Sequence, residues 1–191
     1  MEARSRGAAV ILQQTFRDLD QGGRVSTMRL VDFPTQGAQA QYLRAVVNTY
    51  RNRLPIREKA VAIVRGAGVP PKAKLAQAVA IGRWAQQNLY YVNEPEETFQ
   101  TPLRTIRSGF GDCDDFTTTI ASLCEAIGIP TELVCVGPWP ALTHIFPRAC
   151  IVAGSRIVRV PMDATLPMPI GFDPMVIARR RWPVRAHARV Y

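Results

Sequence analysis

The stretch that decides the fold is residues 109–116, Gly-Phe-Gly-Asp-Cys-Asp-Asp-Phe. It places Cys113 in a polar turn that is led by glycine. Apolar residues then recur at positions i, i+4, i+7 and i+11, the pattern of a helix that faces a core: Phe116, Ile120, Leu123 and Ile127. Gly128 and Pro130 supply the stop signal. We therefore predict a helix that carries Cys113 at its N-terminus, on the face that points into the protein.

The chemistry of such a cysteine depends on its neighbours. Asp112, Asp114 and Asp115 stand where helix caps and first-turn acids belong. A thiol must ionise before it attacks a carbonyl, and a helix N-terminus together with a nearby imidazolium favours the thiolate. The three carboxylates oppose this, so either a histidine must outweigh them or they must turn toward first-turn N–H groups. A capped helix with a buried, inert cysteine is the other interpretation of this stretch.

The residues after the helix predict three strands. Residues 131–136 are rich in β-branched side chains, 143–152 are apolar, and 156–161 form a third β-prone run. His144 is the second residue of the second of these strands, and Asp163 follows the third. The other histidine, His187, lies in a basic tail where we expect a solvated surface role. Cys, His and Asp thus arrive in an order that suits a thiol hydrolase.

The four cysteines do not indicate a metal site. They stand at 113, 124, 135 and 150, and none forms a CxxC or CxH pair, so we expect no zinc and no cofactor. Cys124, Cys135 and Cys150 fall in apolar helix or strand patterns, where cysteine is usually a small buried hydrophobe. Cys113 alone stands in a polar turn.

Four segments together resemble the bacterial and phage-encoded transglutaminase-like superfamily. They are 111–115 (Gly-Asp-Cys-Asp-Asp), 126–131 (Ala-Ile-Gly-Ile-Pro-Thr), 143–144 (Thr-His) and 162–165 (Met-Asp-Ala-Thr). The upstream residues 90–92 and 98–103 are similar as well, and the resemblance covers about 72–173. It implies an α+β, papain-like core with the nucleophile at a helix N-terminus packed on an antiparallel sheet.

The resemblance also implies a role for each member of a triad. Cys113 would attack an acyl group, His144 would act as base and then as acid, and Asp163 would orient the histidine. The backbone N–H of Cys113 is the default first oxyanion donor. Either Gln100 or Tyr91 could be the second. Pro147 departs from a regular strand, because proline cannot donate to a ladder, so we expect a bulge or an edge there.

We divide the chain into four parts. Residues 1–35 form an extended N-terminal arm or hairpin, 36–71 a helical segment, 72–175 the transglutaminase-like core, and 176–191 a basic C-terminal tail. Helical periodicity is expected over 38–53, 57–65 and 72–90, and a loop with Pro95 and Pro102 leads to the site.

Composition limits the partners. The net charge of +9 comes almost entirely from arginine, and we read it as a solvated basic surface. No nucleic-acid module is recognisable, so we expect no nucleic-acid partner, and no apolar run is long enough to span a bilayer. The apolar run 8–12 is too short for a signal-peptide core. We therefore expect a cytoplasmic or virion-associated location.

Two functions follow from these patterns. The first is a cysteine peptidase or amidase that hydrolyses a protein or a cell-wall peptide, with hydrolysis favoured over cross-linking because cross-linking needs an amine site. The second is a structural assembly protein of a phage tail or virion that keeps the fold. In that case residues 1–35 and the basic tail would contact other copies or partners. The alternative for these ends is that they fold back on their own core.

Overall fold

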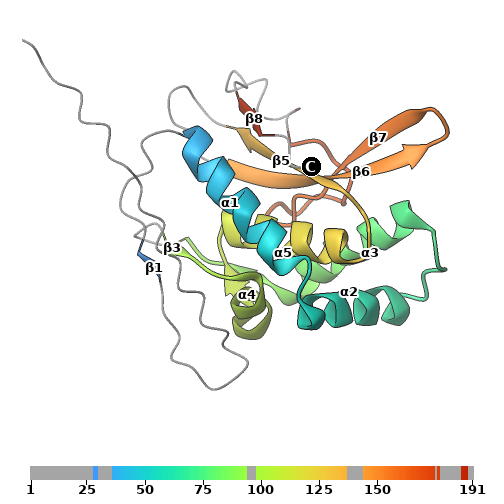
Figure 1. The fold of residues 1–191 in the computed structure, drawn as a ribbon, viewed down its shortest axis with the longest axis horizontal. Helices are drawn as coiled ribbons and strands as arrows, with labels where there is room; N and C mark the ends of the chain where they lie inside the picture. Colours follow the sequence, from blue (N-terminus) through green and yellow to red (C-terminus); the bar gives the residue numbers. More distant parts are fainter. Residues whose placement is uncertain are drawn as a thin grey trace, which may run out of the picture.

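The computed structural model describes residues 28–29, 36–93, 98–136, 144–174, 176 and 186–188. Its centre is a four-stranded antiparallel sheet in the order β7-β6-β5-β8. The strands are β5 (Thr131–Val136), β6 (His144–Ala153), β7 (Arg156–Pro161) and β8 (Ala186–Ala188). A layer of helices covers one face of the sheet (Figure 1). The α+β class and the antiparallel sheet predicted from the sequence are confirmed.

Helix α5 (Cys113–Ala126) lies in the middle of the helix layer. It packs against β6 and against the four other helices, which are α1 (Gln36–Tyr50), α2 (Leu54–Gly66), α3 (Lys74–Asn88) and α4 (Pro102–Ser108). Because it is covered on all sides, every residue from Asp114 to Cys124 is buried. The apolar side chains of α1, α2, α3, α5 and the sheet form one continuous core.

Two pairs of short strands flank the helices. β1 (Met28–Arg29) pairs antiparallel with β3 (Thr98–Phe99), and β2 (Tyr90–Tyr91) pairs parallel with β4 (Phe110–Gly111). The second pair sets Tyr91 opposite Gly111, two residues before Cys113. The chain after α3 is thereby fixed beside the start of α5.

The helices predicted at 38–53, 57–65, 72–90 and after Cys113 are confirmed, as are the three strands of residues 131–161. The loop expected around Pro102 is wrong in one respect, because Pro102 is the first residue of α4. The Thr101 hydroxyl accepts a hydrogen bond from the Arg104 N–H and caps this helix. Proline suits the first helical turn, where its missing N–H would have no intrahelical partner.

Pro147 does not interrupt the register between β5 and β6. β5 and β6 pair without a bulge from Thr131↔Ala149 to Val136↔His144, with Pro147 opposite Leu133. The β7 ladder ends at the pair Arg148↔Pro161, and the Met162 N–H donates to the Pro147 carbonyl at 2.9 Å. In an antiparallel strand the N and O of one residue face the same neighbour. The imino nitrogen therefore faces the segment just beyond the last β7 pair. The bulge or edge predicted from the sequence is wrong, because β6 is an inner strand that pairs regularly with β5 here.

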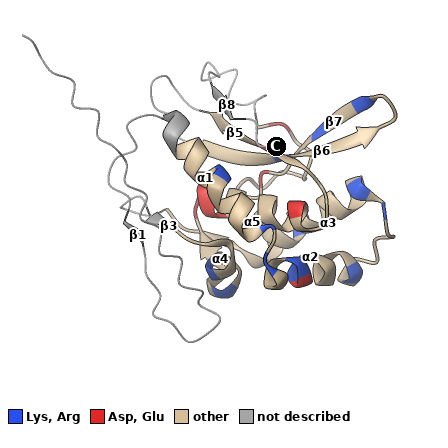
Figure 2. Ribbon diagram, viewed as in Figure 1, with Lys and Arg blue, Asp and Glu red and all other residues tan. Residues whose placement is uncertain are grey.

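Basic side chains gather on the outer surface of the helices and on the β6–β7 hairpin (Figure 2). The exposed ones include Arg57, Arg65, Arg83, Arg107 and Arg156. Within the described ranges, no helix is both long and apolar enough to cross a membrane.

Most of the two predicted end segments lies outside the described residues. Of the arm, the structure describes Met28–Arg29, and of the tail Val176 and Ala186–Ala188. β8 extends the core sheet, since Ala186–Ala188 pairs with β5 from Leu133 to Cys135. Met28–Arg29 and Ala186–Ala188 thus pair with strands of their own chain.

Candidate active site

Cys113 is the first residue of α5 and is partly buried. Asp112 caps this helix: its Oδ1 accepts hydrogen bonds from the N–H groups of Asp114 at 3.1 Å and of Asp115 at 3.4 Å. Those N–H groups have no partner inside a helix, which is why a carboxylate is preferred at this position. These hydrogen bonds partly neutralise the Asp112 charge, which would otherwise oppose a thiolate at Cys113.

Asp115 is held by Gln100. The Gln100 backbone N–H donates to Asp115 Oδ1 at 2.7 Å, and its Nε2 donates to Oδ2 at 3.0 Å. A Cβ on Gly111 would lie 2.7 Å from the Asp115 carboxylate, so glycine is required for this close approach. Asp112 is therefore turned toward first-turn N–H groups, which is one of the two arrangements predicted from the sequence, whereas Asp115 is turned toward N–H groups of Gln100.

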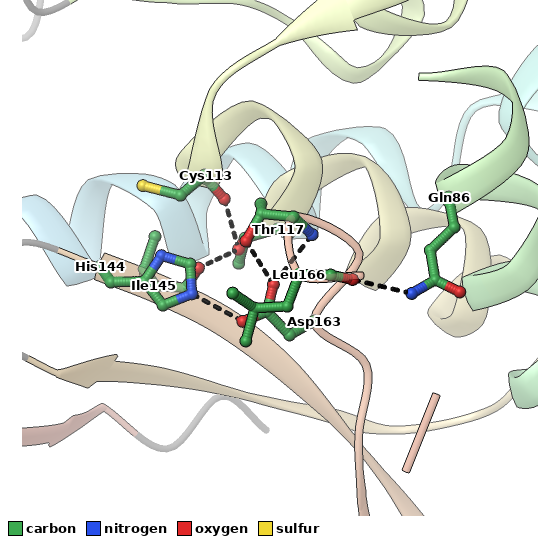
Figure 3. A network of polar contacts seen from close by, with 8 residues as sticks. Gln86, Cys113, Thr117, His144, Ile145, Asp163 and Leu166 are labelled. Atoms are coloured by element: carbon green, nitrogen blue, oxygen red, sulfur yellow. Dashed lines mark hydrogen bonds and ion pairs between the residues drawn. The ribbon is translucent and has the colours of Figure 1, made fainter. Parts of the chain in front are cut away.

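His144 is the first residue of β6, and Asp163 lies two residues after the end of β7. Because these adjacent strands are antiparallel, both residues lie at the same end of the sheet. His144 Nε2 lies 2.7 Å from Asp163 Oδ2, and Asp163 Oδ1 accepts from the Thr165 N–H at 3.0 Å and hydroxyl at 2.7 Å. Figure 3 shows the remaining ring nitrogen, Nδ1, on the side of the ring where the Cys113 side chain lies.

Asp163 is suited to a permanent negative charge. It is only 6% exposed, and burial alone would raise the pKa of its carboxyl. The hydrogen bond and charge of His144, together with the two hydrogen bonds from Thr165, outweigh burial and lower that pKa below its ordinary value. An ionised Asp163 accepts a hydrogen bond from the Nε2–H group. When the ring is neutral, Nδ1 then carries no proton and can act as a base.

Thr117 joins the two halves of the site. Its hydroxyl lies 2.7 Å from the carbonyl oxygen of Cys113 and 3.1 Å from that of Ile145 (Figure 3). The first contact is partly buried and the second is buried. The contact ties the first turn of α5 to β6 one residue after His144. The sequence analysis missed Thr117, although its position four residues after Cys113 on a helix is the signal that could have shown it.

Tyr91 lies close to this constellation. Its ring packs edge-on against Phe116, with centroids 6.3 Å apart, and the residue is half exposed. Burial raises the pKa of its phenol, and so does the negative charge of Cys113, Asp112, Asp114 and Asp163. Tyr91 therefore keeps its proton and remains a hydrogen-bond donor at neutral pH.

Gln100, the other predicted oxyanion donor, is occupied elsewhere. It is 6% exposed, and its Nε2 donates to the Phe110 carbonyl at 3.2 Å as well as to Asp115. Its Oε1 accepts from the Ser108 hydroxyl at 3.4 Å. Both N–H bonds of the amide thus hold the loop before α5.

The other acidic, thiol and histidine groups that the sequence offered for chemistry have different surroundings from the three residues of the site. Side-chain oxygens of Asp112, Asp114 and Asp115 lie within 4.8 Å of one another, but Asp112 and Asp115 already accept the N–H groups named above. Cys124, Cys135 and Cys150 are free thiols, and burial raises the pKa of each. The backbone of His187 pairs with Val134 in the sheet, and its side chain lies outside the described atoms.

Comparison with solved structures reveals similar folds. A candidate protease from Parabacteroides distasonis ATCC 8503 aligns with 74% of this chain at a TM-score of 0.51 and 14% identity. This chain spans 32%, about a third, of that protein. Legionella pneumophila LapG (TM-score 0.44, 15% identity, 66% of this chain and 73% of that one) is also similar. So is a candidate cysteine protease from Cytophaga hutchinsonii, with a TM-score of 0.43, 18% identity, and coverage of 83% of this chain and 44% of that one.

The likeness to the Parabacteroides distasonis protein supports a shared fold and nothing finer. A search of curated proteins finds no match. The family model of the transglutaminase-like superfamily matches residues 61–143, which include α3, α5 and Cys113. Residues 61–143 are therefore similar to the core of the transglutaminase-like superfamily.

Proposed function

We propose that this chain is a thiol hydrolase of the peptidase or amidase type, with Cys113, His144 and Asp163 as its triad. The observation that carries the proposal is the 2.7 Å contact between His144 Nε2 and Asp163 Oδ2. It fixes the imidazole through one nitrogen and leaves the other on the side of Cys113 (Figure 3). This is the division of labour by which a buried carboxylate sets the tautomer of a catalytic histidine.

The reaction would proceed in two steps. His144 Nδ1 takes the thiol proton, Cys113 Sγ attacks the carbonyl carbon, and the carbonyl electron pair moves onto oxygen. Collapse of this intermediate expels the amine, which takes the proton from Nδ1, and leaves a thioester. Water then gives a proton to Nδ1 and attacks the thioester, and the departing thiolate recovers that proton. No oxidant or cofactor is needed for this balance.

Two donors would stabilise the oxyanion. The first is the Cys113 backbone N–H, which lies at a helix N-terminus where such groups have no intrahelical partner. For the second we favour the Tyr91 hydroxyl over Gln100, because both N–H bonds of the Gln100 amide are used by Asp115 and Phe110.

We propose a protein or a cell-wall peptide as substrate, and hydrolysis rather than cross-linking. The alternative role in particle assembly has no support from the described ends of the chain. β1 pairs with β3 and β8 pairs with β5, so these segments act as parts of the fold. We do not propose that role.

The decisive experiment compares two cysteine variants in a hydrolysis assay on casein and on peptidoglycan peptides. Cys113→Ala should abolish release of new amino groups from the substrate that the wild type cleaves. Cys150→Ala, at another partly exposed cysteine, should leave the rate unchanged. Equal activity of Cys113→Ala and wild type would remove Cys113 as the nucleophile.

A further inference from the structure

A cavity of about 600 Å³ adjoins the proposed triad. Phe116, in the first turn of α5 after Cys113, contributes to it, and so does Tyr91 of β2, which pairs with β4 just before Cys113. Ala164 and Thr165 contribute as well, and they directly follow Asp163. The remaining lining residues are Gln86, Leu89, Tyr90, Leu166, Pro167, Met168 and Pro169. The cavity thus lies beside the proposed triad, although none of the three triad residues is part of its lining.

The loop that forms one side of the cavity is anchored to α3. Gln86 Nε2 donates to the carbonyl oxygens of Leu166 at 3.2 Å and of Met168 at 2.8 Å; Figure 3 shows the first of these bonds. Beyond the loop, Ile170 packs so closely on Gly82 that a Cβ there would lie 2.8 Å from its side chain. The loop is therefore held in place before any substrate arrives, and the cavity is preformed.

The lining selects for uncharged groups. None of the described residues that line the cavity bears a charge, and Leu89, Phe116, Leu166, Met168 and two prolines make it largely apolar. A charged side chain would lose part of its hydration there without gaining an opposite charge from the described lining residues. Asp163 lies next in sequence to the lining, so a carboxylate would in addition meet a like charge. An apolar side chain meets neither cost.

We propose that this cavity is the subsite that binds an apolar, uncharged side chain of a peptide substrate beside the bond attacked by Cys113. The inference rests on the proposed hydrolase function. The volume is within the range of about 300–1,000 Å³ that is typical of ligand sites, and it accommodates a leucine or phenylalanine side chain. Met168 is the specificity residue that we single out, because its side chain is partly buried in the lining while its backbone carbonyl is held by Gln86.

The test measures binding in the absence of turnover. The Cys113→Ala protein is titrated into fluorescein-labelled, blocked pentapeptides made of alanine with Leu, Phe, Lys or Asp at the centre, and fluorescence polarisation gives Kd. Leu and Phe peptides should bind about tenfold more tightly than Lys and Asp peptides. Adding Met168→Asp should abolish this preference and favour the Lys peptide. Val152→Asp, the same change at a residue 75% exposed on the β6–β7 hairpin, should leave it intact.

Equal affinities for the four peptides, no binding up to about 1 mM, or identical results for Met168→Asp and Val152→Asp would each overturn the subsite. The hydrolase proposal fails by a different result. If the peptides show the expected preference but wild-type Cys113 reacts with iodoacetamide no faster than the buried thiols, the subsite holds and the proposed chemistry does not.

Discussion

The Thr117 hydroxyl lies 3.1 Å from the carbonyl oxygen of Ile145, and thereby connects the helix that carries Cys113 to the strand that begins at His144. The same hydroxyl lies 2.7 Å from the Cys113 carbonyl. A hydroxyl has one proton, so it is shared between two acceptors on different elements. The relative position of Cys113 and His144 thus depends on a side chain that takes no part in the proposed chemistry.

We expect Thr117→Val to slow hydrolysis about tenfold or more, because small displacements of reacting groups are costly. It should also lower the free energy of unfolding by about 1–3 kcal/mol, since the Ile145 carbonyl loses its partner. Thr119→Val is the matched control: Thr119 is on the same helix, and its buried hydroxyl has no hydrogen-bond partner among the described residues. That variant should be neutral or more stable. Urea unfolding and initial rates measure both, and equal effects of the two variants would contradict the role of Thr117.

Cys113 should be the thiol that reacts first. Burial raises the pKa of Cys135 and Cys150 to about 11 and that of Cys124 further still, so near neutral pH these three are almost entirely protonated. Iodoacetamide labelling of the folded protein followed by peptide mapping should find Cys113 modified well ahead of the others. Uniform labelling of all four would remove the case for an activated thiol, and labelling after unfolding serves as the control for accessibility.

Asp163→Asn tests the carboxylate through pH. Because the pKa of Asp163 in the folded protein lies below the ordinary value of about 3.9, its charge stabilises the fold above that pH. This stabilisation is lost as the pH falls through the folded-state pKa. The free energy of unfolding should therefore differ more between wild type and Asp163→Asn at pH 6 than at pH 3. Hydrolysis near pH 7 should fall on the order of 10⁴-fold, as in other triads. A stability difference that is the same at both pH values would contradict the assignment.

Tyr91→Phe and Gln100→Ala separate the two candidate oxyanion donors. Tyr91→Phe removes a half-exposed hydroxyl and should lower kcat about 10²-fold or more while the melting temperature stays unchanged. Gln100→Ala should lower the melting temperature, because Asp115 and the Phe110 carbonyl lose their hydrogen bonds inside the protein. Thermal melts and kinetics on both variants decide the question. A Tyr91→Phe enzyme with full kcat would leave the backbone N–H of Cys113 as the one donor argued from the structure.

Elements with strong local signals were predictable from the sequence. The stripe from Phe116 to Ile127 and the glycine and proline that end it predict α5 to within a residue, and the β-branched run at 131–136 predicts β5. The Cys-His-Asp order points to one site because strands β6 and β7 form a hairpin that returns the chain to α5. Helix α4 was not predicted, since its seven residues are too few to show a period.

Contacts between polar residues that are far apart in the chain could not be predicted from the sequence. Gln100 was a reasonable oxyanion candidate from its place before the nucleophile, but its amide is committed to Asp115, 15 residues away in the chain. Nor could a pattern show that Gln86 reaches Leu166 and Met168, because the contact depends on how α3 packs beside the loop after Asp163. Both cases concern polar side chains whose partners are set by the tertiary fold.

The contact between Gly82 and Ile170 leads to the last prediction. A Cβ at position 82 would lie 2.8–3.1 Å from three atoms of the Ile170 side chain, closer than packed carbon atoms approach. Gly82→Ala should therefore push Ile170 and its loop away from α3, at a cost of about 1–3 kcal/mol in the free energy of unfolding, although alanine is the better helix former. In an Ile170→Ala background the space is already free, so adding Gly82→Ala should cost nothing or stabilise. Urea unfolding of the wild type, both single variants and the double variant gives the coupling between the two positions. Additive effects would show that Gly82 has another reason to be glycine.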